Sequence, residues 1–330
     1  MELVIDVEPE LGASYDDLMT LAQAVERLGF HGFFLADHYL MGEQKLPGPT
    51  DAWTTIAGLA RDTKRLRLGT LVSPVTFRRP GPLAVAVAQI DAMSGGRVEL
   101  GLGAGHGELE HRAYGIPFYD VGGRFDRLEE QLEIIRGLWT TPVGETYSFN
   151  GKIYQLADCP ALPKPVQQPC PPIVVGGRGP KRTPRLAATF ADELNVSYVP
   201  PPVAREAFGR AQEACEAIGR DPASLRLSTT ALLCCGRDER ELAQRSQRLL
   251  ARRQPVAPPA EENKNLSYWK SYPGFSDVAG FAAVGTPDVL VERLLAYRDA
   301  GASRVYLHVY DVADIEHFEL VATQVMPHLV

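Results

Sequence analysis

The chain has 330 residues, of which 45% are hydrophobic and 23% are charged, and its formal net charge is −7. This composition is typical of a soluble globular enzyme, and the length suits one large α/β domain or two medium ones. The acidic balance argues against a nucleic-acid-binding surface, and no apolar run approaches the roughly 20 residues that a membrane span needs.

Short apolar runs alternate with amphipathic segments along the first 140 residues. Ser14 and Asp17 resemble a capping box at the start of the first helix, and Gly29 ends it. Later in this part, Asp51 caps a helix and Pro82 opens another. The pattern predicts strands at residues 3–7, 32–35, 66–71 and 98–102, and helices at residues 14–28, 52–63, 82–93 and 124–139.

The alternation breaks after residue 140 and then resumes. Residues 146–156 read as a hairpin around Asn150-Gly151, and a proline-rich connector runs from 160 to 172. The resumed pattern predicts strands at 173–175, 193–196, 225–235 and 304–308, and helices at 183–190, 203–218, 239–252, from 287 and at 315–326.

Eight strands, each followed by a helix, predict an α/β protein with the TIM (β/α)8 barrel fold. We expect a single domain over residues 1–330, with insertions near 140–172 and 254–283, the second of which is a candidate substrate lid. A doubly wound sheet would not need eight such units. Polar residues gather at the carboxyl ends of the predicted strands, where such barrels keep their active sites: Asp37, His38, Ser73, Thr76, His106, Arg178, Asn195, Tyr198 and His308.

Two of these strand ends carry a recognisable chemical pattern. Asp37 and His38 form a carboxylate–imidazole pair suited to acid–base chemistry or hydrogen bonding, although a structural pair is the alternative. Residues 176–179, followed by Lys181 and Arg182, combine backbone N–H donors, cations and a helix N-terminus, which indicates an anion site. The alternative there is a basic surface turn.

A third strand, at 98–102, ends in a glycine-rich run over residues 103–107. Because glycine has no side chain, another molecule can approach the backbone closely, so this run is a candidate ligand-binding loop. The alternative is a mobile loop without such a role. The run lacks the spacing of a Rossmann or Walker loop. His106, Glu110 and His111 could suggest a metal together with His38, but their spacing matches no zinc pattern, so we predict no metal.

The chain resembles the luciferase-like monooxygenase superfamily, and within it the branch that uses the deazaflavin coenzyme F420. The similar segments cover most of residues 1–200 and 284–330. They include Phe34 to His38, Arg67 to Thr76, Ser94 to Gly105, Glu110 to Phe118, Arg124 to Glu130, Leu162 to Pro165 and Gly285 to Pro287.

The resemblance implies a deazaflavin lying across the carboxyl ends of the strands. Asp37 and His38 would flank its ring and act in catalysis together with His106, which departs from the Trp or Glu of many relatives. A non-prolyl cis peptide would map to Thr70–Leu71. The coenzyme-binding residues would be Asp37, His38, Thr70, Leu71, Ser73, Thr76, Gly103, Ala104, Gly105, His106, Gly176, Gly177 and Arg178.

The implied activity is hydride transfer between F420 and a small organic substrate. This would be either reduction of an imine, enone or alkene, or oxidation of an alcohol. Two alternatives stay open: a monooxygenase that uses reduced FMN, and a non-catalytic flavin-binding barrel. The resemblance also implies a homodimer. The odd number of cysteines, five without redox-motif spacing, and the absence of a basic leader favour a cytoplasmic protein.

Overall fold

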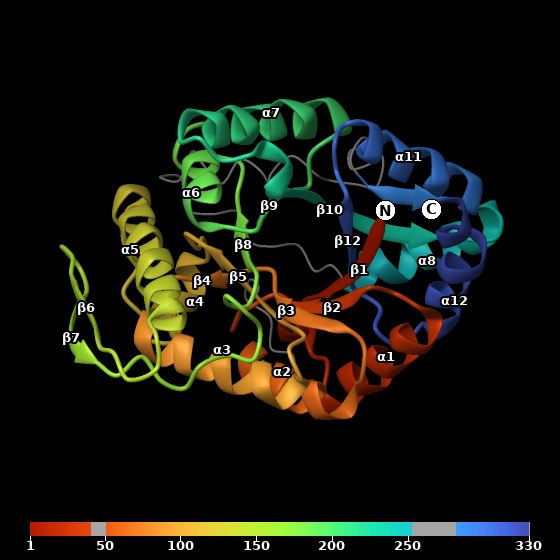
Figure 1. Ribbon diagram of the computed structural model, residues 1–330. Coiled ribbons are helices and arrows are strands. Elements are labelled where there is room, and N and C mark those ends of the chain that lie inside the picture. Colours follow the sequence, from red (N-terminus) through yellow and green to blue (C-terminus); the bar gives the residue numbers. More distant parts are fainter. Residues whose placement is uncertain (41–50, 253–281, 330) are drawn as a thin grey trace.

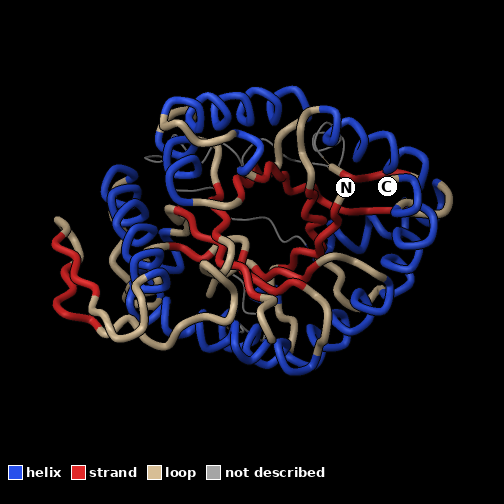
Figure 2. The backbone as a smooth tube through the Cα atoms, viewed as in Figure 1, coloured by secondary structure: helices blue, strands red, loops and turns tan. Residues whose placement is uncertain are grey.

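A computed structural model describes residues 1–40, 51–252 and 282–329. Its centre is a closed barrel of eight parallel strands (Figures 1 and 2), which confirms the predicted TIM-barrel fold. The last strand pairs with the first to close the barrel. In order around the barrel, the strands are β1 (Glu2–Val7), β2 (Gly32–Leu35), β3 (Arg67–Thr70), β5 (Val98–Gly103), β8 (Ile173–Gly176), β9 (Glu193–Ser197), β10 (Arg226–Cys235) and β12 (Arg304–Val309).

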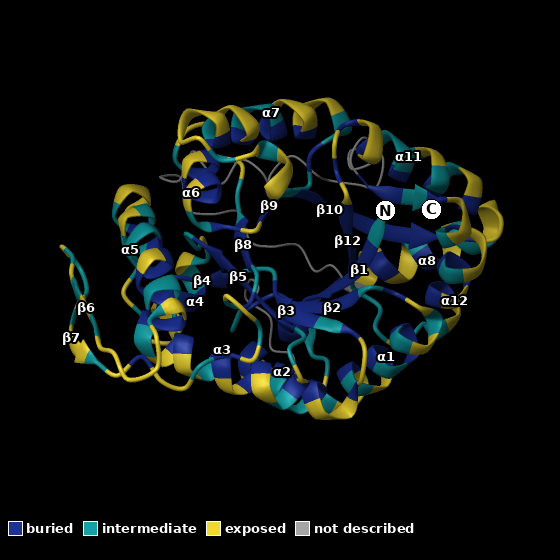
Figure 3. Ribbon diagram, viewed as in Figure 1, coloured by how far each residue is buried: buried dark blue, intermediate teal, exposed yellow. Residues whose placement is uncertain are grey.

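Helices surround the barrel and bury one face against it (Figures 2 and 3). Outward-facing strand residues such as Ile5, Phe33 and Leu68 pack beneath them in one apolar core. No helix in the described part of the chain is both long enough and apolar enough to cross a membrane. The helices are α1 (Tyr15–Leu28), α2 (Ala52–Asp62), α3 (Pro80–Ser94), α4 (Glu108–Ala113), α5 (Val121–Thr140), α6 (Arg182–Phe190), α7 (Pro201–Ala217), α8 (Glu239–Arg252), α11 (Pro287–Asp299) and α12 (Ile315–Gln324).

Several short elements were not predicted from the sequence. These are α4, the two-residue strand β4 (Ser73–Pro74) and β11 (Ala283–Gly285), which pairs with β10. The predicted hairpin consists of β6 (Tyr147–Asn150) and β7 (Gln155–Cys159), and it stands outside the helices beside α5 (Figure 1). The candidate lid at 254–283 lies, apart from its last two residues, outside the described residues.

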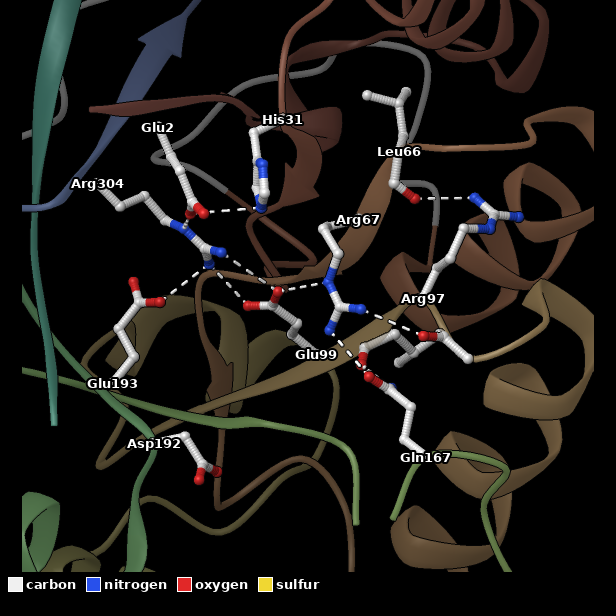
Figure 4. A network of polar contacts seen from close by, with 12 residues as sticks. Glu2, His31, Leu66, Arg67, Arg97, Glu99, Gln167, Asp192, Glu193 and Arg304 are labelled. Atoms are coloured by element: carbon white, nitrogen blue, oxygen red, sulfur yellow. Dashed lines mark hydrogen bonds and ion pairs between the residues drawn. The ribbon is translucent and has the colours of Figure 1, made fainter. Parts of the chain in front are cut away.

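Charged side chains form the lowest layer inside the barrel, at the amino ends of the strands (Figure 4). We call this set, Glu2, Arg67, Glu99, Glu193 and Arg304, the floor network. Nη1 of Arg304 lies 2.7 Å from Glu99 and 2.9 Å from Glu193, and Nε of Arg67 lies 2.7 Å from Glu99. Buried charges are costly unless they are paired, and each carboxylate of the floor network meets an arginine.

An aromatic layer lies above the floor network. Val4, Phe34 and Tyr306 are fully buried there, and the two rings meet edge to face with centroids 5.2 Å apart. The ring of Phe34 occupies the space beside Gly69, where an added Cβ would come within 2.6 Å of it. These side chains fill the barrel interior, so a ligand site must lie above them, at the carboxyl ends of the strands, which we call the mouth.

Candidate active site at the mouth of the barrel

Three side chains form a cluster between the end of β2 and the start of α4. Nδ1 of His38 lies 2.8 Å from Oε1 of Glu110. The ring of His106 meets that of His38 edge to face, with centroids 5.0 Å apart. The side chain of Glu110 is buried and that of His38 is 13% exposed, whereas His106 is exposed. A buried carboxylate is thus linked to the surface of the mouth through an imidazole.

Backbone groups fix the position of the Glu110 carboxylate. Its Oε2 accepts hydrogen bonds from the N–H groups of Tyr39 at 2.9 Å and Leu40 at 3.4 Å. Gly107, the N-cap of α4, lies so close that an added Cβ would be 2.1 Å from Oε1 of Glu110. The glycine at 107 therefore makes room for the carboxylate that pairs with His38.

The two histidines differ in their tendency to hold a proton. Burial lowers the pKa of His38, but the hydrogen bond and charge of Glu110 outweigh burial and raise the pKa to about 10. Desolvation at the mouth and the positive charge of His38 lower the pKa of His106. When the pKa values of two neighbouring groups are shifted in opposite directions, one group can act as an acid and the other as a base at neutral pH. The cluster can donate a proton from His38 and accept one at His106.

The carboxylate of Asp37 is held by groups from the exit of β3. Its Oδ2 accepts a hydrogen bond from Ser73 at 2.6 Å and forms an ion pair with Arg78. Burial raises the pKa of Asp37, although Arg78 and Ser73 act to lower it. Thr70 lies beside Ser73, with 3.2 Å between their hydroxyl oxygens. Oδ1 of Asp37 is buried and has no hydrogen-bond partner in the described part of the chain, so a ligand can bond to it.

The non-prolyl cis peptide at the exit of β3 joins Leu71 to Val72. The predicted position, Thr70–Leu71, is wrong by one residue. The N–H of Leu71 donates to the carbonyl of Leu35 at 2.9 Å, so the preceding peptide still belongs to the ladder with β2. The side chain of Val72 then packs over Gly103, where an added Cβ would lie 2.6 Å from it.

The predicted loop over residues 103–106 passes close to Thr76. Gly105 has φ +79°, and an added Cβ would lie 3.0 Å from Pro74 and 3.4 Å from the Thr76 hydroxyl. That hydroxyl lies 2.6 Å from Nε2 of His111, whose Nδ1 lies 2.6 Å from the carbonyl of Gly107. His111 is therefore bound on both ring nitrogens. Within the described ranges, no group of three or more His, Cys, Asp or Glu could hold a metal ion.

The glycine run after β8 meets the N-terminus of α6. Cβ atoms added at Gly177, which has φ +152°, and at Gly179 would lie 3.2 and 3.0 Å from the hydroxyl of Thr183. This hydroxyl is buried and has no hydrogen-bond partner among the residues described. The first turn of α6 also has no side-chain cap. Free donors at a helix N-terminus suit an anion, and Thr183 adds a group that the sequence interpretation missed.

Arg182, one of the cations predicted at the anion site, forms ion pairs with α5. Nη2 of Arg182 lies 2.6 Å from Asp126 and 3.4 Å from Glu129, both on α5. Arg178 is exposed and directly follows the glycines that face Thr183. Arg182 therefore has acidic partners on α5 that lie more than 50 residues away along the chain, and its contribution to an anion site stays a prediction.

Acidic groups lie at the mouth on the side of β1 and β12. Oδ2 of Asp6 lies 3.3 Å from Nδ1 of His308, and Nε2 of His308 lies 3.5 Å from Oε1 of Glu8. The hydroxyl of Tyr198 lies 2.7 Å from Nδ1 of His308. His308 and Tyr198, both predicted at the mouth, do lie together. Asp6 and Glu8 were not predicted there, because in the sequence they belong to an apolar strand and the turn after it. The predicted Asn195 is instead buried inside the barrel.

A separate open cleft of about 770 Å³ lies at the amino ends of the strands, lined among others by Cys170, Asp192 and Arg226. Asp192 accepts the N–H of Ile173 at 2.8 Å, and Arg226 reaches Glu193 at 3.5 Å. Asp192 and Arg226 of this cleft thus contact residues at the floor of the barrel.

The family model of luciferase-like monooxygenases matches residues 3–304. The chain belongs to the luciferase-like monooxygenase family. It is 34% identical over 166 residues to the oxygenase component of the flavin-dependent trigonelline monooxygenase of Acinetobacter baylyi, which covers 50% of this chain and 44% of that protein. It is 29% identical over 329 residues to the F420-dependent hydroxymycolic acid dehydrogenase of Mycobacterium tuberculosis, which covers 95% and 84%.

The match spans about half the length of the first curated relatives, from 44% to 52% of each. A solved F420-dependent secondary alcohol dehydrogenase, in complex with an F420–acetone adduct, superposes with a TM-score of 0.83 at 18% identity and covers 100% of this chain and 99% of that one. Identity at this level shows a shared fold. Together, the dehydrogenases and monooxygenases among the relatives support an oxidoreductase of the luciferase-like type.

Proposed function

We propose that this luciferase-like protein transfers a hydride between coenzyme F420 and a small organic substrate. The reaction is reduction of an imine, enone or alkene, or oxidation of an alcohol. The pair of His38 and Glu110 beside His106 carries the proposal, because hydride transfer at a polar bond requires a proton to move at the neighbouring atom. Similarity to an F420-dependent dehydrogenase over 95% of the chain supports the coenzyme.

The groups at the mouth fit such a coenzyme. The buried hydroxyl of Thr183 and Oδ1 of Asp37 lack hydrogen-bond partners within the described residues, so each can bond to a ligand. The proposed contacts are made by Asp37, His38, Thr70, Leu71, Ser73, Thr76, Gly103, Ala104, Gly105, His106, Gly176, Gly177, Arg178 and Thr183.

When bound, F420 supplies or accepts the hydride and reacts poorly with oxygen. In reduction, the imidazolium of His38 would donate a proton to the substrate atom next to the carbon that receives the hydride. In oxidation, the neutral ring of His106 accepts the proton of the substrate hydroxyl. Glu110 orients His38 and holds its positive charge. Asp37 belongs to the proposed site through its unpartnered Oδ1.

A second candidate is a monooxygenase that uses reduced FMN. The 34% identity to a flavin-dependent monooxygenase favours it. The same strand ends would hold the flavin ring. In either case we propose a homodimer with a small-molecule substrate and without a nucleic-acid or membrane partner, and these properties stay predictions.

A parallel titration with oxidised F420 and with FMN tests the coenzyme. We expect F420 to bind about tenfold more tightly than FMN, because a site discriminates between two ligands through contacts that suit one of them better. Thr183→Val keeps the side-chain shape and should weaken F420 binding about tenfold through loss of one charge-assisted hydrogen bond. Thr189→Val, an exposed position on the same helix, is the matched control. A preference for FMN would favour the monooxygenase, and failure to bind either coenzyme would contradict both candidates.

A further inference from the structure

Three carboxylates from β1 and the following 3-10 turn η1 (Pro9–Leu11) lie at the mouth: Asp6, Glu8 and Glu10, which we call the acidic rim. Their exposed fractions are 3%, 9% and 6%. Oδ1 of Asp6, Oε2 of Glu8 and both carboxylate oxygens of Glu10 are buried without a hydrogen-bond partner in the described part of the chain. A buried carboxylate without partners is costly, so the acidic rim suits a group that these residues do not supply.

The floor network shows how the same barrel treats buried carboxylates when their role is structural. Glu99 meets both Arg67 and Arg304, and Glu193 meets Arg304 (Figure 4). Glu193 also accepts a hydrogen bond from the hydroxyl of Tyr306. No oxygen of Glu99 or Glu193 is among the unpartnered buried atoms of the described residues. Among the described residues, the carboxylates of the acidic rim face imidazoles, whereas those of the floor network pair with arginines.

The charges around the acidic rim have a negative excess. Its three carboxyl groups and that of Glu110 face two imidazoles, His38 and His308. With all four carboxyl groups ionised and both imidazoles protonated, two negative charges remain. Burial raises the pKa of Asp6 to about 6 and that of Glu10 well above its ordinary value. Protons thus compensate the excess, and an entering cation would replace them.

The surroundings favour an organic cation over a metal ion. No group of His, Cys, Asp and Glu in the described ranges could hold a metal. Two aromatic rings flank His308 instead: the ring centroid of Tyr198 lies 5.6 Å from the imidazole and that of Tyr310 lies 4.7 Å away. Aromatic faces attract ammonium groups. Tyr198 also has φ +54°, a conformation that residues with a Cβ adopt rarely and chiefly at functional positions.

The acidic rim lies beside His38 and across the mouth from the two glycine runs that are proposed to bind the coenzyme. Around the barrel, β12 is four strands from β5, and β1 is four strands from β8. The glycine runs assigned to the coenzyme follow β5 and β8. We propose that the acidic rim binds a cationic nitrogen of the substrate, which makes the substrate an organic ammonium or iminium compound. This inference rests on the proposed function for the position of the coenzyme.

Calorimetric titration of the full chain with benzylammonium and with benzyl alcohol, two molecules of similar shape and different charge, tests the inference without coenzyme. We expect benzylammonium to bind about tenfold more tightly than benzyl alcohol, and Glu10→Gln or Glu8→Gln to remove that advantage. Titrations in buffers of different ionisation enthalpy should show proton release on binding of benzylammonium. Glu319→Gln, an exposed position on α12, removes the same charge far from the mouth and should change nothing.

Two results would overturn the inference: equal affinity for the two probes, or an advantage of benzylammonium that survives both rim substitutions. Circular dichroism checks that each variant is folded, and the two rim variants are independent, so loss of one leaves the test intact. If the rim binds benzylammonium as expected but neither F420 nor FMN binds the chain, the proposed function fails while the cation site stands. If F420 binds and benzylammonium has no advantage, only the cation site fails.

Discussion

Replacing Glu110 by glutamine should return the pKa of His38 toward its ordinary value. The rise from 6.5 to about 10 corresponds to about 5 kcal/mol in favour of the imidazolium. Glutamine keeps an oxygen for the N–H of Tyr39 but removes the charge. Since Glu10 and Glu8 continue to raise the pKa of His38 while burial lowers it, we expect the pKa of His38 in the variant to lie well below that in the unmodified protein.

The same pair should leave a signature in stability. The folded pKa of His38 is raised, so its contribution is complete below pH 6.5 and is lost as the pH rises toward 10. The folded pKa of Glu110 is lowered, so its contribution is present above pH 4.5. The variant's deficit in the free energy of unfolding should therefore be largest between pH 4.5 and 6.5. It should fade in alkaline solution.

Ring-nitrogen NMR titration measures the pKa directly, with His38→Asn used to assign the resonance, and urea unfolding across pH measures the stability. Glu108→Gln removes an exposed charge from the same turn of α4 and serves as the control. The reasoning is refuted if His38 titrates near 6.5 in the unmodified protein. It is equally refuted if Glu110→Gln leaves the His38 titration where it was.

Three further changes test the charges of the barrel. Arg304→Met removes the cation that Glu99 and Glu193 share and should cost about 3–5 kcal/mol in urea unfolding. An unchanged midpoint would show that this shared ion pair does not stabilise the fold. The folded pKa of Asp6 is raised to about 6 from 3.8, so its burial should weaken stability by about 3 kcal/mol as the pH rises from 4 to 7. Asp6→Asn should abolish that slope, and a persisting slope would assign it elsewhere. Gly107→Ala should displace the Glu110 carboxylate and lower the pKa of His38, which the ring-nitrogen titration would reveal.

The barrel itself could be predicted because each strand is an apolar run bounded by turn or cap residues. Ser14 and Asp17 form the predicted capping box, with hydrogen bonds of 3.2 and 2.9 Å. A strand of two residues such as β4 and a helix of six residues such as α4 are too short to produce a periodic pattern. Burial of Arg304 on β12 was also invisible, because its partners come from other strands far away in sequence.

The site could be predicted only as a set of strand ends. Asp37, His38 and His106 stand out because each follows an apolar run. The pairing of His38 with Glu110, by contrast, joins residues 72 positions apart. The sequence offered one signal for Glu110: it is a charged residue in the first turn of a helix that follows a glycine run. The unpartnered oxygens of Glu10 follow from packing of the whole mouth, which no local pattern encodes.

The most direct test of the proposed function is anaerobic incubation of the protein with reduced F420 and a panel of imines, enones, alkenes and ketones, with the absorbance of the oxidised coenzyme as the readout. Running the panel with reduced FMN in the presence and absence of oxygen completes the comparison. The proposal predicts that oxidised F420 appears without oxygen when a substrate is present, and that His38→Asn slows its appearance strongly. Turnover that requires both FMN and oxygen, or a His38→Asn variant with undiminished rate, would contradict it.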